Sequence, residues 1–132
     1  MSGIRFPTLE EVLELQRIQI DTFGGSHGLR DAGLLRSALA QPEMQFGGSY
    51  VHPDLASMAG AYLFHLAKNH PFVDGYKRVA AATTLLFLAL NGKPSLPDPD
   101  QLGDLTLAVA AGEKSKDDAI AFFRALLTEG PH

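Results

Sequence analysis

The sequence predicts an all-α fold, a single-domain bundle of about six helices. Two observations support this prediction: apolar residues recur at helical spacing in successive segments, and most of these segments follow residue patterns that cap helices. No segment shows the alternation of a convincing strand. The 132 residues, 45% of them apolar, suffice for one hydrophobic core, so residues 1–132 are assigned to one domain.

The first helix is expected over residues 9–23. Thr8 and Glu11 form a capping box, in which each side chain accepts a hydrogen bond from the other residue's backbone amide. Leu9, Val12 and Ile20 recur at helical spacing. The pair Gly24-Gly25 supplies the left-handed backbone that commonly ends a helix.

A second and a third helix follow. Asp31 is a good N-cap for the second, and Pro42 stops it. Residues 43–53 contain a Gly pair and are expected to form a loop or irregular flap. Asp54 caps the third helix, which we expect to run to about Asn69.

Three further helices complete the bundle. A strongly apolar one is expected over roughly 78–91, with Gly92 as its C-cap, and its composition predicts the buried central helix. Another is expected over about 99–111. Ser115 and Asp118 cap the last.

Composition excludes several classes of protein. With 15 acidic and 11 basic residues, the net charge of -4 gives no electrostatic footprint for nucleic acid. The absence of Cys excludes a disulfide scaffold or a thiolate zinc site and fits a reducing compartment. The N-terminus lacks the apolar core of a signal peptide, and the longest apolar run, 79–90, is too short to cross a bilayer. We therefore expect a cytoplasmic protein that binds neither nucleic acid nor membrane.

The chemical centre is predicted between the third and fourth helices, in the stretch His70-Pro71-Phe72-Val73-Asp74-Gly75-Tyr76-Lys77-Arg78. A turn that enters a helix presents unpaired amides, here those of Gly75, Tyr76 and Lys77, and the helix dipole adds positive potential. Such a cradle suits a phosphate group.

Four side chains of this stretch have candidate roles. Asp74 can supply one hard oxygen ligand to Mg²⁺, which otherwise keeps water and substrate phosphate oxygens. Arg78 can hold a phosphate bidentately, and Lys77 can act as a point charge on a second phosphate. His70 can remove the proton from an attacking hydroxyl. Phe72 is interpreted as a core residue that pins this stretch, and the other histidines and most other aromatic residues as structural, and no set of His side chains has the spacing of a zinc site. Phe46 and Tyr50 fit either a lid over the core or a flap that contacts a target peptide, and they are not assigned to the site.

The nonapeptide resembles the loop His-Pro-Phe-x-Asp/Glu-Gly-Asn-Gly/Lys-Arg of the Fic family, which likewise lies between two helices. Lys77, where AMP-transferring members usually have Gly, is similar to the Doc branch. Residues 23–25, 28–35 and 85–92 also look Doc-like, so the similarity covers nearly the whole chain.

This resemblance implies a Fic/Doc fold and the toxin of a toxin–antitoxin pair. It implies transfer of the γ-phosphate of ATP, with Mg²⁺, to a hydroxyl of a translation elongation factor; nucleotidyl (AMP) transfer and a catalytically inactive binding module are the alternatives. It also implies an antitoxin whose disordered C-terminal segment folds onto this domain. The family's internal inhibitory pattern, Ser/Thr-x-x-x-Glu-Gly/Asn, is not evident, because Ala125 precedes the only Glu-Gly pair by four positions.

Tyr76 is the one departure from the family loop, which has Asn at this position. A phenol cannot supply the paired donor and acceptor of an amide, and its greater bulk next to the anion cradle can block a phosphate or displace Lys77. We therefore expect weaker transferase activity than with Asn at this position.

Overall fold

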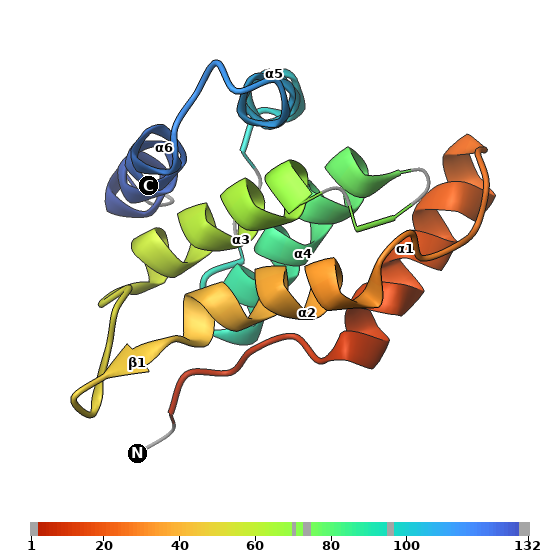
Figure 1. The fold of residues 1–132 in the computed structure, drawn as a ribbon. Helices are drawn as coiled ribbons and strands as arrows, with labels where there is room; N and C mark the ends of the chain where they lie inside the picture. Colours follow the sequence, from red (N-terminus) through yellow and green to blue (C-terminus); the bar gives the residue numbers. More distant parts are fainter. Residues whose placement is uncertain (1–2, 70, 73–74, 95–96, 130–132) are drawn as a thin grey trace.

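The computed structural model describes residues 3–69, 71–72, 75–94 and 97–129. This part of the chain forms six α-helices, one 3₁₀ turn and a small hairpin (Figure 1). In chain order the elements are α1 (Leu9–Phe23), α2 (Ala32–Ala40), the 3₁₀ turn η1 (Gln41–Glu43), β1 (Gln45–Phe46), β2 (Ser49–Tyr50), α3 (Leu55–Asn69), α4 (Tyr76–Leu90), α5 (Pro99–Ala110) and α6 (Lys116–Glu129). The prediction of an all-α bundle of about six helices is thus confirmed.

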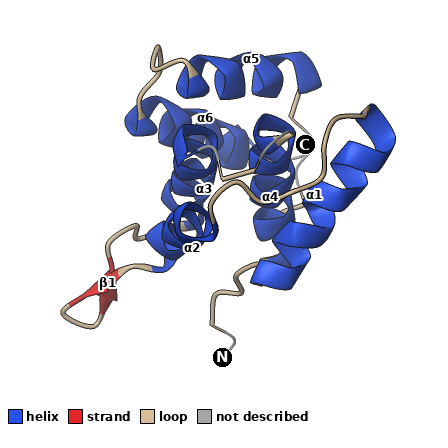
Figure 2. Ribbon diagram, turned by 45° about the vertical axis from the view of Figure 1, so that its right-hand side comes forward, coloured by secondary structure: helices blue, strands red, loops and turns tan. Residues whose placement is uncertain are grey.

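Helix α3 occupies the centre of the bundle. It packs against α2, α4, α5 and α6, and Figures 1 and 2 show α3 and α4 lying between α5 and α6 on one side and α1 and α2 on the other. The sequence analysis had assigned the central position to the segment that forms α4. That segment is buried inside the bundle as predicted, but α3, rich in small residues, packs against more helices and buries more of its length.

Helices α3 and α6 approach each other closely at Gly60. A β-carbon built on Gly60 would lie 2.7 Å from both the backbone nitrogen and the α-carbon of Ile120, so only Gly allows the two helices this approach. α3 and α6 also share the most extensive interhelical packing among the described elements. The C-terminal helix is therefore an integral layer of the core.

The predicted caps are present. The Thr8 hydroxyl accepts from the Glu11 amide at 3.1 Å while the Glu11 carboxylate accepts from the Thr8 amide at 2.8 Å. The side chain of Asp31 accepts from the amide of Leu34 at 3.0 Å at the start of α2. Equivalent side-chain caps at Asp54 and Ser115 begin α3 and α6. These bonds satisfy amides that have no partner within the helix.

Residues 45–50 form a β-hairpin that extends away from the helices (Figures 1 and 2). Gln45 pairs with Tyr50 and Phe46 with Ser49, and both glycines of the turn have positive φ. The sequence analysis expected a flap here but no strand. Two residues per strand are too few to produce a recognisable alternation, which explains the difference.

Helix α4 begins at Tyr76, two residues earlier than expected. Its N-cap is Gly75, with φ +75° in the left-handed region, and the amide of Val79 donates to the Gly75 carbonyl at 2.9 Å. Tyr76, Lys77 and Arg78 consequently form the first turn of the helix and not the loop before it.

Within the described ranges, no helix is long and apolar enough to span a bilayer.

Candidate functional site

The structure places four of the six predicted site residues together. Gly75, Tyr76, Lys77 and Arg78 occupy the N-terminal turn of α4 and line one cavity. His70 and Asp74, the predicted base and metal ligand, lie outside the described residues. The described part of the site is therefore the part that carries its two cations, Lys77 and Arg78.

The C-terminal turn of α1 fixes the backbone at the start of α4. A β-carbon on Gly75 would lie 3.3 Å from Cδ1 of Ile20, a buried residue of α1. The left-handed φ and this close contact together require Gly at position 75. The same contact sets the position of the first α4 amides relative to α1.

A second support comes from the segment between α1 and α2. The carbonyl of Pro71 accepts from the amides of Arg30 at 2.8 Å and Asp31 at 3.2 Å. The Arg30 guanidinium also donates to the carbonyl of Asn69 at 2.9 Å. Phe72 pairs with Leu29 in an isolated bridge and is 2% exposed. The prediction that Phe72 is a core residue pinning the motif is thus confirmed.

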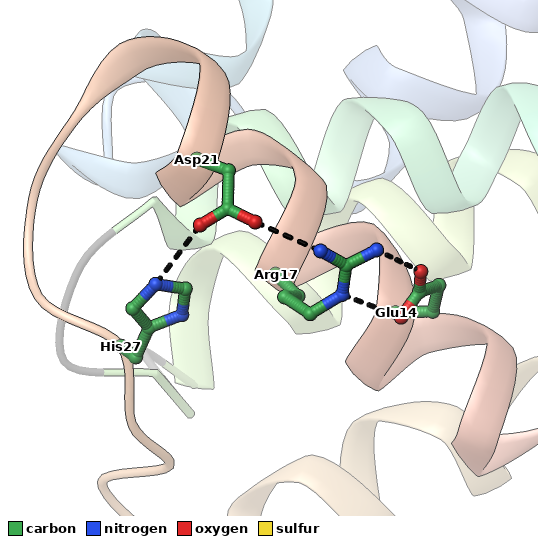
Figure 3. Close-up of polar contacts among 4 residues, drawn as sticks. All are labelled: Glu14, Arg17, Asp21 and His27. Atoms are coloured by element: carbon green, nitrogen blue, oxygen red, sulfur yellow. Dashed lines mark hydrogen bonds and ion pairs between the residues drawn. The ribbon is translucent and has the colours of Figure 1, made fainter.

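The supporting segment is itself tied back to α1 by a chain of polar contacts (Figure 3). The imidazole of His27 lies 3.1 Å from the Asp21 carboxylate, and Asp21 accepts from the Arg17 guanidinium at 2.8 Å. Arg17 also contacts Glu14 through two nitrogens. The hydrogen bond from Arg17 holds the pKa of Glu14 below its ordinary value. All four side chains are about half exposed, so these polar contacts order the surface of the protein and not its core.

Both motif cations lie over aromatic rings. The Arg78 guanidinium carbon is 4.4 Å from the centroid of the Phe23 ring, and the Lys77 ammonium is 5.4 Å from that of Tyr76. In the described part of the chain, no ion pair involves either cation. Their positive charges are therefore not neutralised by a described carboxylate.

The four site residues open onto a cavity of about 700 Å³ between α4 and α5. Its cationic end is the first turn of α4. Its apolar wall is built by both helices and the segment between them: Ala81, Leu85, Pro97, Pro99, Leu102, Gly103, Thr106 and Leu107. One charged end and a long apolar wall are the properties of a pocket for a ligand with an anionic group and a flat apolar part.

Tyr76 lies at the junction of this cavity with a second, smaller one. Its ring is partly buried and packs against the hydrophobic core, so it is a wall of the site rather than a free side chain on its surface. The sequence analysis had considered that this ring displaces Lys77. The ammonium instead lies over the ring, which keeps Lys77 beside the cavity.

Buried His52 and partly buried His65 lie apart from the cavity. His52 Nε2 is 3.4 Å from the Lys116 ammonium, and burial followed by this nearby charge lowers the pKa of His52. Burial, with Lys116 and His52 as further causes, lowers the pKa of His65 to about 4. Neither residue lines the cavity, in agreement with their interpretation as structural. His132 lies outside the described residues.

The sequence analysis missed the contribution of α1 and α5 to the site. Phe23 and Ile20 support the first turn of α4, and α5 supplies much of the apolar wall. The only sequence signal for the α1 contribution was the Doc-like stretch 23–25, which begins at Phe23.

The fold, the motif and the comparisons agree on the class of protein. A sequence model described as "Fic/DOC family" matches residues 6–88, from the segment before α1 to the last turn of α4. The chain therefore belongs to the Fic/DOC family.

Two relatives narrow this similarity to the Doc branch. "Toxin Doc" of Mycolicibacterium smegmatis (strain ATCC 700084 / mc(2)155) is 40% identical over 101 residues, which cover 75% of this chain and 78% of that protein. "Protein kinase doc" of Escherichia phage P1 is 33% identical over 106 residues, which cover 80% of this chain and 82% of that protein. The chain is thus a Doc-like member of its family.

Proposed function

We propose that this protein is a toxin that transfers the γ-phosphate of ATP to a hydroxyl group of a protein. The observation that carries the proposal is the first turn of α4, where Gly75, Lys77 and Arg78 meet at the cationic end of the cavity. The phage relative is named a protein kinase, which favours phosphate transfer over the transfer of AMP.

In the proposed reaction the imidazole of His70 takes the proton of the target hydroxyl. The hydroxyl oxygen forms a bond to the γ-phosphorus while the bond from that phosphorus to the β,γ-bridging oxygen breaks, and ADP leaves. Arg78 holds two oxygens of one phosphate through its planar fork, and Lys77 offsets charge on the next phosphate. These cations act where negative charge develops, in a cavity that is largely apolar.

Mg²⁺ fits the chemistry of this loop. Among the described residues no group of three or more His, Asp or Glu side chains is placed to hold a metal, whereas one carboxylate with phosphate oxygens and water is a common arrangement for nucleotide-bound Mg²⁺. Asp74 is the residue proposed to supply that carboxylate. The ion would neutralise phosphate charge during transfer.

The cavity accounts for the rest of the nucleotide. Its volume of about 700 Å³ is within the range of small-molecule sites, and its apolar wall extends from the phosphate cradle along α5. We place the phosphates at the first turn of α4 and the base against the α5 wall.

Two protein partners belong to this proposal. The target is a protein hydroxyl, and a translation elongation factor is the proposed bearer of it. The regulator is an antitoxin with a disordered C-terminal segment that folds onto this domain, a proposal supported by the name of the mycobacterial relative, a toxin.

A second candidate function is favoured by Tyr76. If the phenol in place of the family's Asn abolishes transfer, the domain retains only partner binding. The partly buried ring lines the cavity beside Lys77 and packs against the core, so it changes the site without disrupting the fold.

One experiment separates these functions. The chain and its Tyr76→Asn variant are incubated with cell extract and ATP labelled at either the α- or the γ-phosphate. Protein that carries the γ-label supports phosphate transfer, and protein that carries the α-label supports AMP transfer. No label from either variant contradicts the enzyme and supports the binding module.

A further inference from the structure

The exposed ring of Phe23 has no packing role that explains it. It is the last residue of α1 and is 60% exposed, and it is not among the described residues of the hydrophobic core. Its described contact is with the guanidinium of Arg78, 4.4 Å from the ring centroid. The two residues are 55 positions apart in sequence, so this contact exists only because α1 packs on α4.

Stacking on a ring holds an arginine without occupying its donors. In a stacked pair the face of a guanidinium meets the ring, while its N–H groups lie in the guanidinium plane and stay available to a phosphate. A carboxylate partner would hold Arg78 equally well but would compete with phosphate for the same donors. No described hydrogen bond or ion pair engages the Arg78 side chain, which matches the first arrangement.

The position of the ring is fixed by the backbone around it. One turn before Phe23, Cδ1 of Ile20 lies 3.3 Å from where a β-carbon on Gly75 would stand, at the start of α4. One residue after it, Gly24 ends α1 with φ +88° and donates its amide to the Ile20 carbonyl at 2.8 Å. The last turn of α1 therefore carries the Phe23 ring and also packs against the start of α4. A guanidinium that stacks on the ring is held beside the first turn of α4.

We infer that Phe23 is a positioning residue of the phosphate site: its ring holds the Arg78 guanidinium at the mouth of the cavity with its donors free for a nucleotide phosphate. This inference rests on the proposed function, because it assigns Phe23 to the ATP site of that function. It predicts a dependence on the aromatic ring and not on apolar bulk.

The test measures the Kd for Mg-ATP and the kcat and KM of transfer for Phe23→Leu and Phe23→Tyr. Leu keeps the apolar bulk and loses the ring, whereas Tyr keeps the ring. We expect Phe23→Leu to weaken Mg-ATP binding by about two- to fivefold, the range of an exposed cation–π contact, and Phe23→Tyr to restore most of the affinity. Ile18→Ala, which alters another exposed apolar side chain of α1, is the matched control.

A double-mutant cycle ties the effect to Arg78. In an Arg78→Ala background, Phe23→Leu should cause no further loss of Mg-ATP affinity, because the ring then has no guanidinium to hold. The NMR signal of the Arg78 side-chain N–H should also shift in Phe23→Leu as the ring current is lost, and melting curves of all variants verify that they fold.

The outcomes distinguish the two proposals. If the chain binds Mg-ATP and Phe23→Leu binds it equally well, or loses the same factor in the Arg78→Ala background, the role of Phe23 is refuted and the proposed function stands. If neither the chain nor Tyr76→Asn binds Mg-ATP, the proposed function is refuted, and the role of Phe23 with it.

Discussion

Replacing Gly60 by Ala tests how closely α3 and α6 are packed. The added β-carbon would meet the backbone nitrogen and α-carbon of Ile120 at 2.7 Å and the Cγ1 of the same residue more closely still. Those backbone contacts are 0.7 Å shorter than the 3.4 Å at which ordinary contact begins. Because two of the three clashing atoms are backbone, no change of rotamer relieves the clash, and the two helices must separate along their whole interface.

The cost follows from two opposing effects. Overpacking a core costs about 1–3 kcal/mol, and a backbone clash places this site at the upper end of that range. Ala gains about 1 kcal/mol over Gly within a helix. The free energy of unfolding should therefore fall by about 2 kcal/mol, and for a domain of this size the Tm should fall by roughly 8 °C.

The assay is thermal and urea unfolding followed by circular dichroism. Gly103→Ala is the matched control, because Gly103 also lies within a helix, but a β-carbon there meets nothing within 4 Å. This control should raise the free energy of unfolding by about 0.5–1 kcal/mol. If Gly60→Ala proved as stable as the starting chain, the close α3–α6 packing and the argument built on it would be wrong.

Three further predictions concern the site, the pH dependence and the N-terminal segment. Tyr76→Asn should transfer phosphate roughly 10²–10³ times faster, as expected for a regained oriented donor, and melt within a few degrees of the starting chain; equal rates in a phosphotransfer assay would show that Tyr76 is a functional alternative. The pKa of His65 is lowered to about 4 from its ordinary 6.5. Between pH 4 and 6.5 the unfolded chain therefore binds a proton at His65, whereas the folded chain does not. Stability should therefore be complete above pH 6.5 and fall by about 2–3 kcal/mol on approaching pH 4, and urea titrations of His65→Gln should show a flatter dependence. Asn91→Ala should cost about 1–2 kcal/mol in the same titrations, because the side chain exchanges hydrogen bonds of 2.9 and 2.7 Å with the backbone of Arg5 and caps the Phe87 carbonyl; an unchanged midpoint would show that the N-terminal segment is not held there.

The helices were predicted well from the sequence because short capping patterns determine where most of them begin. Capping patterns at Thr8, Asp31 and Ser115 act over three or four residues, and the structure contains the bonds that they predict. The start of α4 was misplaced because Gly75 caps it through backbone conformation alone, with no side-chain hydrogen bond. The central position of α3 was missed because it depends on how many helices surround an element, which periodicity does not encode.

In the candidate site, too, local features were predicted from the sequence and long-range contacts were not. The nonapeptide was recognisable because its residues are contiguous and their chemistry is combined in one loop. The contacts of Arg78 with Phe23 and of Gly75 with Ile20 span more than fifty residues and arise from the packing of α1 on α4. No local sequence pattern predicts such a contact, although an aromatic residue before a Gly pair, here Phe23, is a reason to consider one.

The packing of α6 on α3 has a consequence for where this protein can be divided. The family match ends at residue 88, yet the helix that fills the surface around Gly60 begins at Lys116, and one wall of the cavity is α5. A fragment trimmed to the recognisable family segment would contain the whole nonapeptide but expose to water the face of α3 that packs on α6. The segment that matches the family is thus shorter than the domain that packs around α3. A fragment for expression should therefore include α5 and α6.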